Sequence, residues 1–252
     1  MKNNKIGILD SGLGGLSILK ELLKTLPNED YLFYEDSINN PYGEKSDKEI
    51  LEIVSKIVDY LLEKECKIIV LACNTATTSC LKKLREIYPN TIFVGTVPAL
   101  KVSFDHNFKN TLLLATPYTI KSTRVEELIA DFKHSNQNVY LESGRNLAHL
   151  IELGDTKEIE KLLKDVLTPY KNKIDSIVLG CTHYPLVKEN FKKILPNCEI
   201  IDGSLGVSCE VKHQLIINNL VNDNIKNGSV IIENSKSEDL IDRSYEILSN
   251  IC

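Results

Sequence analysis

Two rhythms of apolar and polar residues alternate along the first part of this chain. Short apolar runs typical of buried strands occur at residues 5–9, 31–34, 67–72 and 92–95. Apolar side chains that recur every three or four positions, which is typical of helices packed by one face, occur at residues 16–26, 50–62 and 81–87. The sequence Ser46-Asp-Lys-Glu49 precedes the second of these helices and predicts a capping box.

The same alternation continues to the C-terminal part of the chain. Strands are predicted at residues 111–115, 139–141, 176–180, 199–201 and 229–233. Helices are predicted at residues 121–132, 146–153, 157–167, 186–195, 206–221 and 238–248. Strands that alternate with helices predict an α/β fold with mainly parallel sheets flanked by helices.

One sequence pattern occurs twice. Residues 69–75 (IVLACNT) and residues 177–183 (IVLGCTH) each read as an apolar strand, a small residue, a cysteine and two polar residues before a helix. Residues 6–10 and their helix parallel residues 112–116 and theirs in the same way. We therefore expect two similar α/β domains, with a boundary near Pro98.

Composition narrows the class of protein. The 252 residues are 42% apolar and 26% charged, as in ordinary globular proteins, and the net charge of -5 comes without any basic block. Nucleic-acid binding is therefore not expected. No apolar run approaches the roughly 20 residues that span a bilayer, and the first apolar run is too short for a signal-peptide core. These features predict a cytoplasmic protein without a membrane partner.

Seven cysteines, an odd number without any Cys-x-x-Cys pair, predict free thiols rather than a disulfide framework. Two of them, Cys73 and Cys181, follow predicted strands, where open α/β sheets bind ligands. Helix N-terminal amides after each strand favour a thiolate. The polar residues expected at these strand ends are Asp10, Ser11, Cys73, Asn74, Thr75, Thr116, Cys181, Thr182 and His183. The amides, with Ser11, Asn74, Thr75 and Thr182, can hold a substrate carboxylate.

The presence of two similar cysteines indicates a particular chemistry. Inverting a carbon centre requires removal of a proton from one face and delivery of a proton to the other. Two thiols, one from each domain, can do both, because a free thiol has a pKa of only about 8.5. Asp10 in the first domain and His183 in the second are candidates to exchange protons with Cys73 and Cys181.

At these residues the chain resembles the glutamate racemases of the aspartate/glutamate racemase superfamily. The matching stretches are residues 7–15 (GILDSGLGG), 36–37 (DS), 41–46 (PYGEKS), 72–77 (ACNTAT), 119–122 (TIKS) and 179–186 (LGCTHYPL). The resemblance implies reversible interconversion of L- and D-glutamate without a cofactor or metal, which supplies D-glutamate for peptidoglycan. It also implies a homodimer, with the active site in the cleft between two domains made of residues 1–97 plus 206–252 and residues 98–205.

The resemblance also implies roles for individual residues. Cys73 and Cys181 match the two acid/base cysteines, assisted by Asp10 and His183, and Glu152 matches an acid near the second cysteine. The substrate-contacting positions are implied to be Asp10, Ser11, Pro41, Tyr42, Gly43, Asn74, Thr75, Thr116, Thr119, Thr182 and His183. The chain departs from the family pattern at residues 39–40, 142–149 and 203–204.

Several alternatives remain open from the sequence. Aspartate racemase is the nearest, while hydantoin racemase and arylmalonate decarboxylase are more distant. A thiol hydrolase or amidase would use Cys181 and His183 but leave Cys73 without a role. A dinucleotide site is disfavoured because Ser17 replaces the third glycine of the usual fingerprint, and a zinc site lacks a recognised ligand spacing. A non-catalytic amino-acid binding module would not need two thiols.

Overall fold

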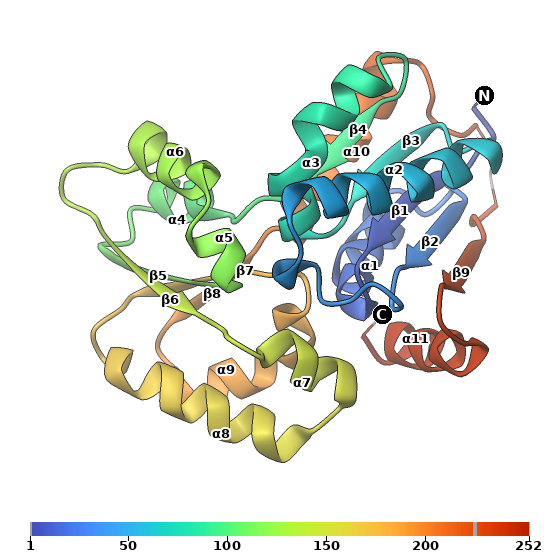
Figure 1. Cartoon of the computed structure of the whole chain (residues 1–252). Coiled ribbons are helices and arrows are strands. Elements are labelled where there is room, and N and C mark those ends of the chain that lie inside the picture. Colours follow the sequence, from blue (N-terminus) through green and yellow to red (C-terminus); the bar gives the residue numbers. More distant parts are fainter. Residues whose placement is uncertain (1, 224–225, 252) are drawn as a thin grey trace. The chain divides into compact units, whose positions relative to one another are not determined.

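The computed structural model describes residues 2–223 and 226–251, which form two compact units (Figure 1). Unit 1 takes in the described residues up to Thr96 and from Ser204 onward, and unit 2 is Val97–Gly203. The chain therefore leaves unit 1, completes unit 2 and returns to unit 1. Among the described residues, no helix combines the length and the apolar character needed to cross a membrane.

Unit 1 is built on a sheet of five parallel strands in the order β4-β3-β1-β2-β9. Its strands are β1 (Ile6–Asp10), β2 (Tyr31–Glu35), β3 (Ile68–Leu71), β4 (Phe93–Gly95) and β9 (Val230–Asn234). Its α-helices are α1 (Leu16–Thr25), α2 (Asp47–Glu63), α3 (Asn74–Ile87), α10 (Ser204–Ile217) and α11 (Glu238–Ile251). Two 3-10 turns, η1 (Leu13–Gly15) and η2 (Tyr42–Glu44), lie in the loops that follow β1 and β2.

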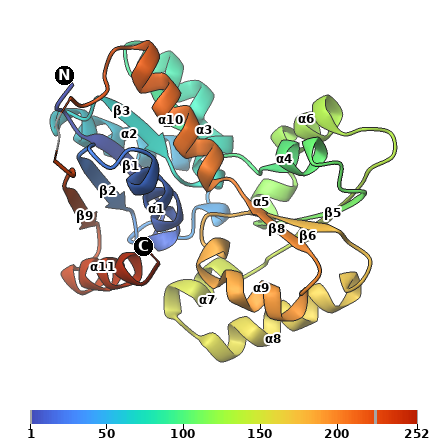
Figure 2. The same ribbon diagram turned by 180° about the vertical axis from the view of Figure 1, so that it is seen from behind.

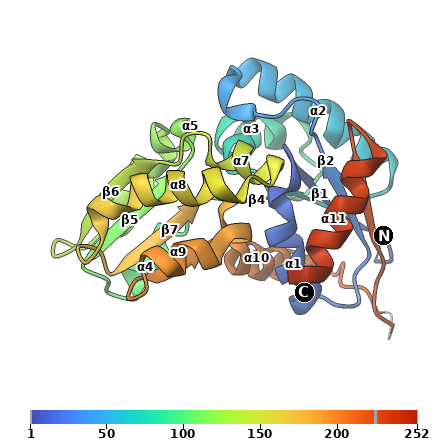
Figure 3. The same cartoon turned by 90° about the horizontal axis from the view of Figure 1, so that it is seen from below.

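Helices cover both faces of this sheet, which explains why its central strands are buried and largely apolar. Every residue of β1 and β3 is buried. Helices α2 and α3 pack against each other on one face, and α1 and α10 pack against each other on the opposite face (Figure 2). Helix α11 packs against β9 and α1 (Figure 3). The predicted capping box begins α2, where the Ser46 hydroxyl accepts from the Glu49 amide and Glu49 accepts from the Ser46 amide.

A buried ion pair fixes the amino ends of the strands in unit 1. The ammonium of Lys67 lies 2.5 Å from the Glu29 carboxylate, and both side chains are almost fully buried. Lys67 also donates to the carbonyls of Lys2 and Leu220, and Glu29 accepts from the Asn222 amide. The segment that follows α10 is therefore tied to the start of the sheet, at the end away from the strand termini where ligands are expected.

Unit 2 is built on four parallel strands in the order β6-β5-β7-β8. These strands are β5 (Asn110–Ala115), β6 (Asn138–Ser143), β7 (Ser176–Gly180) and β8 (Glu199–Asp202). Its α-helices are α4 (Leu100–Asp105), α5 (Pro117–Ile120), α6 (Thr123–Phe132), α7 (Leu147–Leu153), α8 (Thr156–Leu167) and α9 (Lys188–Ile194). The 3-10 turns are η3 (Thr168–Tyr170) and η4 (Tyr184–Val187). The prediction of an α/β fold with parallel sheets is confirmed.

The two sheets repeat one strand order. Taken in chain order, β1 to β4 occupy the same relative places in unit 1 as β5 to β8 occupy in unit 2, and β9 is an additional edge strand. Because of this repeat, β1 and β5 are equivalent, as are β3 and β7. Residues that follow equivalent strands therefore occur at equivalent places in the two units.

Some helix boundaries differ from the sequence prediction. The helix expected at residues 121–132 is α6, which begins two residues later at Thr123, and Pro117 begins a separate short helix, α5, that was not predicted. The helix expected at residues 206–221 begins at Ser204 and ends at Ile217, because Asn219 adopts a left-handed conformation and the Leu220 amide donates to the Leu215 carbonyl. Helix α4 was not predicted.

Candidate active site

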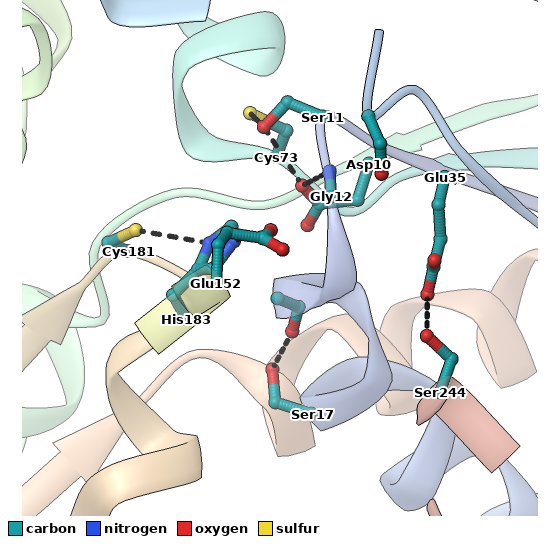
Figure 4. A network of polar contacts seen from close by, with 12 residues as sticks. Asp10, Ser11, Gly12, Ser17, Glu35, Cys73, Glu152, Cys181, His183 and Ser244 are labelled. Atoms are coloured by element: carbon teal, nitrogen blue, oxygen red, sulfur yellow. Dashed lines mark hydrogen bonds and ion pairs between the residues drawn. The ribbon is translucent and has the colours of Figure 1, made fainter. Parts of the chain in front are cut away.

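A thiol and a carboxylate lie at neighbouring strand ends in unit 1. Asp10 ends β1 and Cys73 follows β3, and these two strands pair directly. The Ser11 hydroxyl donates to Asp10 Oδ1 at 3.2 Å and lies 3.7 Å from Cys73 Sγ (Figure 4). Ser11 thus joins the two groups. The sequence indicated Ser11 as a carboxylate contact, but no spacing signal could place its hydroxyl beside a thiol 62 residues away.

Cys73 occupies the N-cap position of α3. The following residues, Asn74 and Thr75, are buried in the first turn of a 14-residue helix. The unpaired amides of such a turn carry partial positive charge, which favours a thiolate at Cys73 and can bind a carboxylate. The arrangement that the sequence predicted around Cys73, a strand followed directly by a helix, is therefore present.

The turn η2 contacts α3, and its Tyr42 belongs to the same buried cluster as Cys73 and Ala76 at the start of that helix. Pro41 and Gly43 are exposed, whereas Tyr42 is buried and its hydroxyl donates to Asp36 Oδ2 at 2.7 Å. No atom outside the neighbouring residues lies within 4 Å of where a Cβ on Gly43 would be. The backbone at Gly43 is therefore accessible to a ligand, while the Tyr42 hydroxyl is occupied.

The equivalent place in unit 2 holds the second thiol. Cys181 follows β7 and Thr116 follows β5, and the preceding residues Ala115 and Gly180 are register partners in the sheet. The Thr116 hydroxyl accepts from the Thr119 amide at 3.2 Å and donates to the Thr119 hydroxyl at 3.0 Å. Thr116 therefore caps α5. Thr182 is buried beside Cys181.

A second acid and a histidine adjoin Cys181. His183 Nδ1 lies 3.8 Å from Cys181 Sγ, and His183 Nε2 lies 2.6 Å from Glu152 Oε1. The Glu152 side chain comes from α7 (Figure 4). Burial lowers the pKa of His183, but its hydrogen bonds with Cys181 and Glu152 outweigh burial and hold that pKa well above the usual range. The geometry therefore favours an imidazolium next to the thiol.

The predicted helix N-terminus directly after Cys181 is absent. The chain forms the 3-10 turn η4 there, and α9 begins only at Lys188. Pro185 near the start of η4 has no amide hydrogen to donate. Helix amides supply the positive charge beside Cys73. At Cys181 that positive charge comes from His183 instead.

Three other thiols differ from Cys73 and Cys181 because burial raises their pKa values. Burial raises the pKa of Cys66 to about 11, and it raises the pKa of Cys80 and of Cys198 to about 12. Such thiols stay protonated near neutral pH and behave as small apolar groups. In the part of the chain that the structure describes, no group of three His, Cys, Asp or Glu side chains is arranged to hold a metal ion.

The comparisons of the sequence with known proteins agree on one protein family. Residues 28–205 match the Asp/Glu/Hydantoin racemase family. A glutamate racemase of Clostridium botulinum (strain Alaska E43 / Type E3) is 40% identical, over 99% of this chain and 98% of that protein. A glutamate racemase of Clostridium novyi (strain NT) is also 40% identical, over 98% of this chain and 97% of that protein.

Solved structures resemble the whole chain as well. The crystal structure of glutamate racemase from Francisella tularensis in complex with D-glutamate has a TM-score of 0.85 and 31% identity, covering 99% of this chain and 95% of that one. Escherichia coli glutamate racemase in complex with L-glutamate and an activator has a TM-score of 0.83 and 29% identity, covering 98% and 95%. An aspartate racemase of Picrophilus torridus, 20% identical with a TM-score of 0.62, shares the fold.

Proposed function

The chain belongs to the Asp/Glu/Hydantoin racemase family and is an isomerase, and we propose that its substrate is glutamate, which it interconverts between the L and D forms. The observation that carries this proposal is the equivalent placement of two thiols, Cys73 after β3 and Cys181 after β7. The choice of glutamate is supported by relatives that carry this name at about 40% identity over nearly the whole chain.

The proposed reaction removes the proton from one face of Cα and delivers a proton to the opposite face. A thiolate at one cysteine takes the α-hydrogen, so that the Cα–H bond breaks, an S–H bond forms and the electron pair stays on the substrate. The thiol of the other cysteine then gives its proton to the opposite face and becomes a thiolate. The reverse direction exchanges the roles of Cys73 and Cys181, so no external acid, base or cofactor is required.

The surrounding groups support each step. Positive potential from the first turn of α3 stabilises the thiolate of Cys73 and the negative charge that develops on the substrate. The His183 imidazolium does the same at Cys181, and Glu152 orients its ring. Asp10 can exchange a proton with Cys73 through the Ser11 hydroxyl. These residues are the proposed acid/base machinery.

Substrate binding is assigned to the remaining polar groups at the strand ends. Amides and side chains of Ser11, Asn74, Thr75 and Thr182, together with the segment 41–43, whose backbone is open at Gly43, are suited to carboxylates. Thr116 and Thr119 border the same edge of the sheet in unit 2. We place the enzyme in the cytoplasm, as a homodimer that supplies D-glutamate for peptidoglycan.

A solvent-exchange experiment tests the reaction. The full chain, dialysed against a chelator, is incubated with L-glutamate in deuterated water without pyridoxal phosphate, nicotinamide or metal. Proton NMR follows loss of the α-hydrogen signal, and chiral chromatography follows D-glutamate. We expect the α-hydrogen signal of L-glutamate to disappear and D-glutamate to form. A second sample that begins with D-glutamate should form L-glutamate at a similar rate. We also expect the active chain to restore growth of a bacterium that requires D-glutamate.

Parallel samples with aspartate decide the substrate. Exchange and inversion of aspartate alone would replace the proposal by aspartate racemisation. Absence of exchange with either amino acid, in protein shown to be folded by circular dichroism, would contradict a racemase acting on acidic amino acids. Equilibrium sedimentation of the same preparation tests the proposed homodimer.

A further inference from the structure

A buried acid that the proposed mechanism does not use lies beneath residues 39–43. Asp36 follows β2 and is 2% exposed. Both of its carboxylate oxygens accept from Asn39 Nδ2, at 2.9 Å each, and Oδ2 also accepts from the Tyr42 hydroxyl at 2.7 Å. Three side-chain hydrogen bonds therefore converge on one carboxylate from residues three and six positions further along the chain.

The backbone of Asp36 is fixed to the strand that carries the catalytic acid. Its amide donates to the Asp10 carbonyl at 2.8 Å, and its carbonyl accepts from the Asn39 amide at 3.2 Å. Asp36 thus has a defined position relative to Asp10 and also binds the segment that follows it. Pro41 and Gly43 are exposed on the outer side, so this segment is held mainly from beneath.

Tyr42 transmits this anchoring to the segment that faces the ligand. Tyr42 as a whole residue is 2% exposed, and it belongs to the apolar cluster that includes Leu9, Leu71 and Cys73. Burial and the adjacent Asp36 carboxylate raise the pKa of Tyr42, so the phenol keeps its proton and donates a hydrogen bond to Asp36. The Tyr42 hydroxyl is consequently occupied by Asp36, and the exposed neighbours Pro41 and Gly43 are the part of the segment available to a ligand.

We propose that Asp36 is a positioning residue, which fixes the backbone of residues 41–43 for the substrate through its hydrogen bonds with Tyr42 and Asn39. This inference rests on the proposed racemase function, because it assigns these backbone groups to the bound amino acid. Groups of the substrate that are common to both enantiomers bind there, so loss of Asp36 weakens binding of L- and D-glutamate alike. Asp36 itself touches neither the substrate nor a thiol.

Two conservative variants remove the anchor in different ways. In Asp36→Asn the side-chain carbonyl can still accept from Tyr42, but the new amide group points donor hydrogens at the Asn39 amide. In Tyr42→Phe the ring and its packing remain, while the donor to Asp36 is lost. The matched control is Tyr31→Phe, because Tyr31 is also fully buried and its hydroxyl donates to the Leu22 and Leu26 carbonyls at the other end of β2.

Steady-state kinetics in both directions give the first readout. We expect Asp36→Asn and Tyr42→Phe each to raise KM for both enantiomers about tenfold, with kcat changed by less than about threefold, because a charge-assisted hydrogen bond that aligns a binding segment is lost. Tyr31→Phe is expected to keep KM within about twofold of the wild type. The double variant Asp36→Asn/Tyr42→Phe should raise KM no more than the stronger single variant.

Amide hydrogen exchange of residues 38–45 without substrate gives the second readout, independent of the reaction. We expect faster exchange in Asp36→Asn and Tyr42→Phe than in the wild type and Tyr31→Phe. If the wild type does not racemise glutamate, the proposed function fails, yet this exchange pattern would still support the anchoring role. Unchanged exchange together with unchanged KM would overturn the inference, as would an equal rise of KM in Tyr31→Phe. Should Asp36→Asn fail to fold, Tyr42→Phe against Tyr31→Phe decides alone.

Discussion

At the scale of single residues, the two thiols receive different electrostatic support. Cys73 faces the amides at the start of α3, whose charge does not titrate, whereas Cys181 faces His183, whose charge does. A helix N-terminus contributes about 0.3–1 kcal/mol, and up to about 2 kcal/mol where partly buried. A full positive charge on a nearby ring interacts more strongly. The pH dependence of the proposed reaction should therefore reflect the groups around Cys181.

Removing either thiol should abolish inversion. We expect Cys73→Ala and Cys181→Ala each to lower kcat by at least about 1,000-fold in both directions, because each lacks the acid or the base for one face. The remaining thiolate can still exchange the α-hydrogen of a single enantiomer. Each variant should thus incorporate deuterium into one enantiomer only, without inverting it, and the enantiomer should differ between the two variants. NMR and chiral chromatography measure this.

The control for these variants is another buried thiol. Cys80 lies on α3, donates to the Ala76 carbonyl and has a raised pKa. Cys80→Ala should keep nearly full activity. Racemisation close to the wild-type rate in either Cys73→Ala or Cys181→Ala would contradict the mechanism with two thiols.

His183 should make stability depend on pH. Because its folded pKa is raised above the ordinary value of about 6.5, protonation stabilises the folded state. This contribution is complete below about pH 6.5 and is lost as the pH rises through the folded pKa. We expect the unfolding midpoint of His183→Gln to fall furthest below the wild type near pH 6, and the difference to narrow in alkaline solution.

Thermal unfolding followed by circular dichroism at a series of pH values checks this expectation. His213→Gln, on the exposed side of α10, controls for the loss of one histidine. Glu152→Gln should lower the pKa of His183 in an NMR titration, because a hydrogen-bonded carboxylate is replaced by a neutral amide. A difference between His183→Gln and the wild type that grows with pH would show that the charged ring is not stabilising.

The candidate site was only partly predictable from the sequence. Cys73 and Cys181 could be found because their flanking residues repeat. The contact of Glu152 with His183 joins residues 31 positions apart on different elements, and the sequence indicated it only through a family resemblance. The position of Asp36 beneath Tyr42 depends on how the loop after β2 folds, which hydrophobic patterns do not describe.

At the scale of elements, amphipathic periodicity predicted the long helices well. In α2 the buried residues follow the predicted stripe, and the capping box fixes its start. The failures occur where local chemistry decides. Pro117 begins the short helix α5 ahead of α6, Pro185 contributes to a 3-10 turn before α9, and the short α4 offers too few residues for a period to be recognised.

Gly144 allows a close approach that any side chain would prevent. It follows β6, and a Cβ there would overlap the hydroxyl and ring of Tyr184, which is fully buried in η4. We expect Gly144→Ala to destabilise the protein by about 1–3 kcal/mol, measured by urea unfolding, because neither the strand end nor the ring can move freely.

The comparison variant is Gly206→Ala in α10. A Cβ there meets no atom within 4 Å outside its chain neighbours and the adjacent helix backbone, so this variant should be neutral or stabilising by up to about 1 kcal/mol, as alanine favours a helix. Equal stability of Gly144→Ala and the wild type would mean that Tyr184 can leave its place. Because α7 packs against η4, such movement would also alter the position of Glu152.

At the scale of the whole molecule, one strand order is used twice, so each unit places polar side chains at equivalent strand ends. A cysteine follows β3 in unit 1 and the equivalent β7 in unit 2. A polar residue lies at the end of the neighbouring strand, Asp10 at β1 and Thr116 at β5. The sequence revealed this duplication through two seven-residue repeats. The additional strand β9 completes only the sheet of unit 1.

The two units should differ in their ability to fold alone. Residues 97–203 contain all four strands of their sheet and a buried cluster that includes Leu113, Val125 and Val178. We expect this fragment to unfold cooperatively in urea, followed by circular dichroism. Residues 1–96 should not, since they lack α10 against α1 and lack Leu220 and Asn222 around the Lys67–Glu29 pair. A cooperative transition in the shorter fragment would contradict this expectation.

The return of the chain to unit 1 has a consequence for synthesis on the ribosome. The first four strands of unit 1 emerge early, but α10, β9 and α11 leave the exit tunnel only after the whole of unit 2. Unit 2 is therefore the first part that can finish folding, although it is encoded second. Until the last strand arrives, the β2 edge is an open template for pairing with other nascent chains. Slow translation beyond residue 204 would prolong that exposure, so chaperone dependence should increase with codon changes there more than with changes in the middle of the gene.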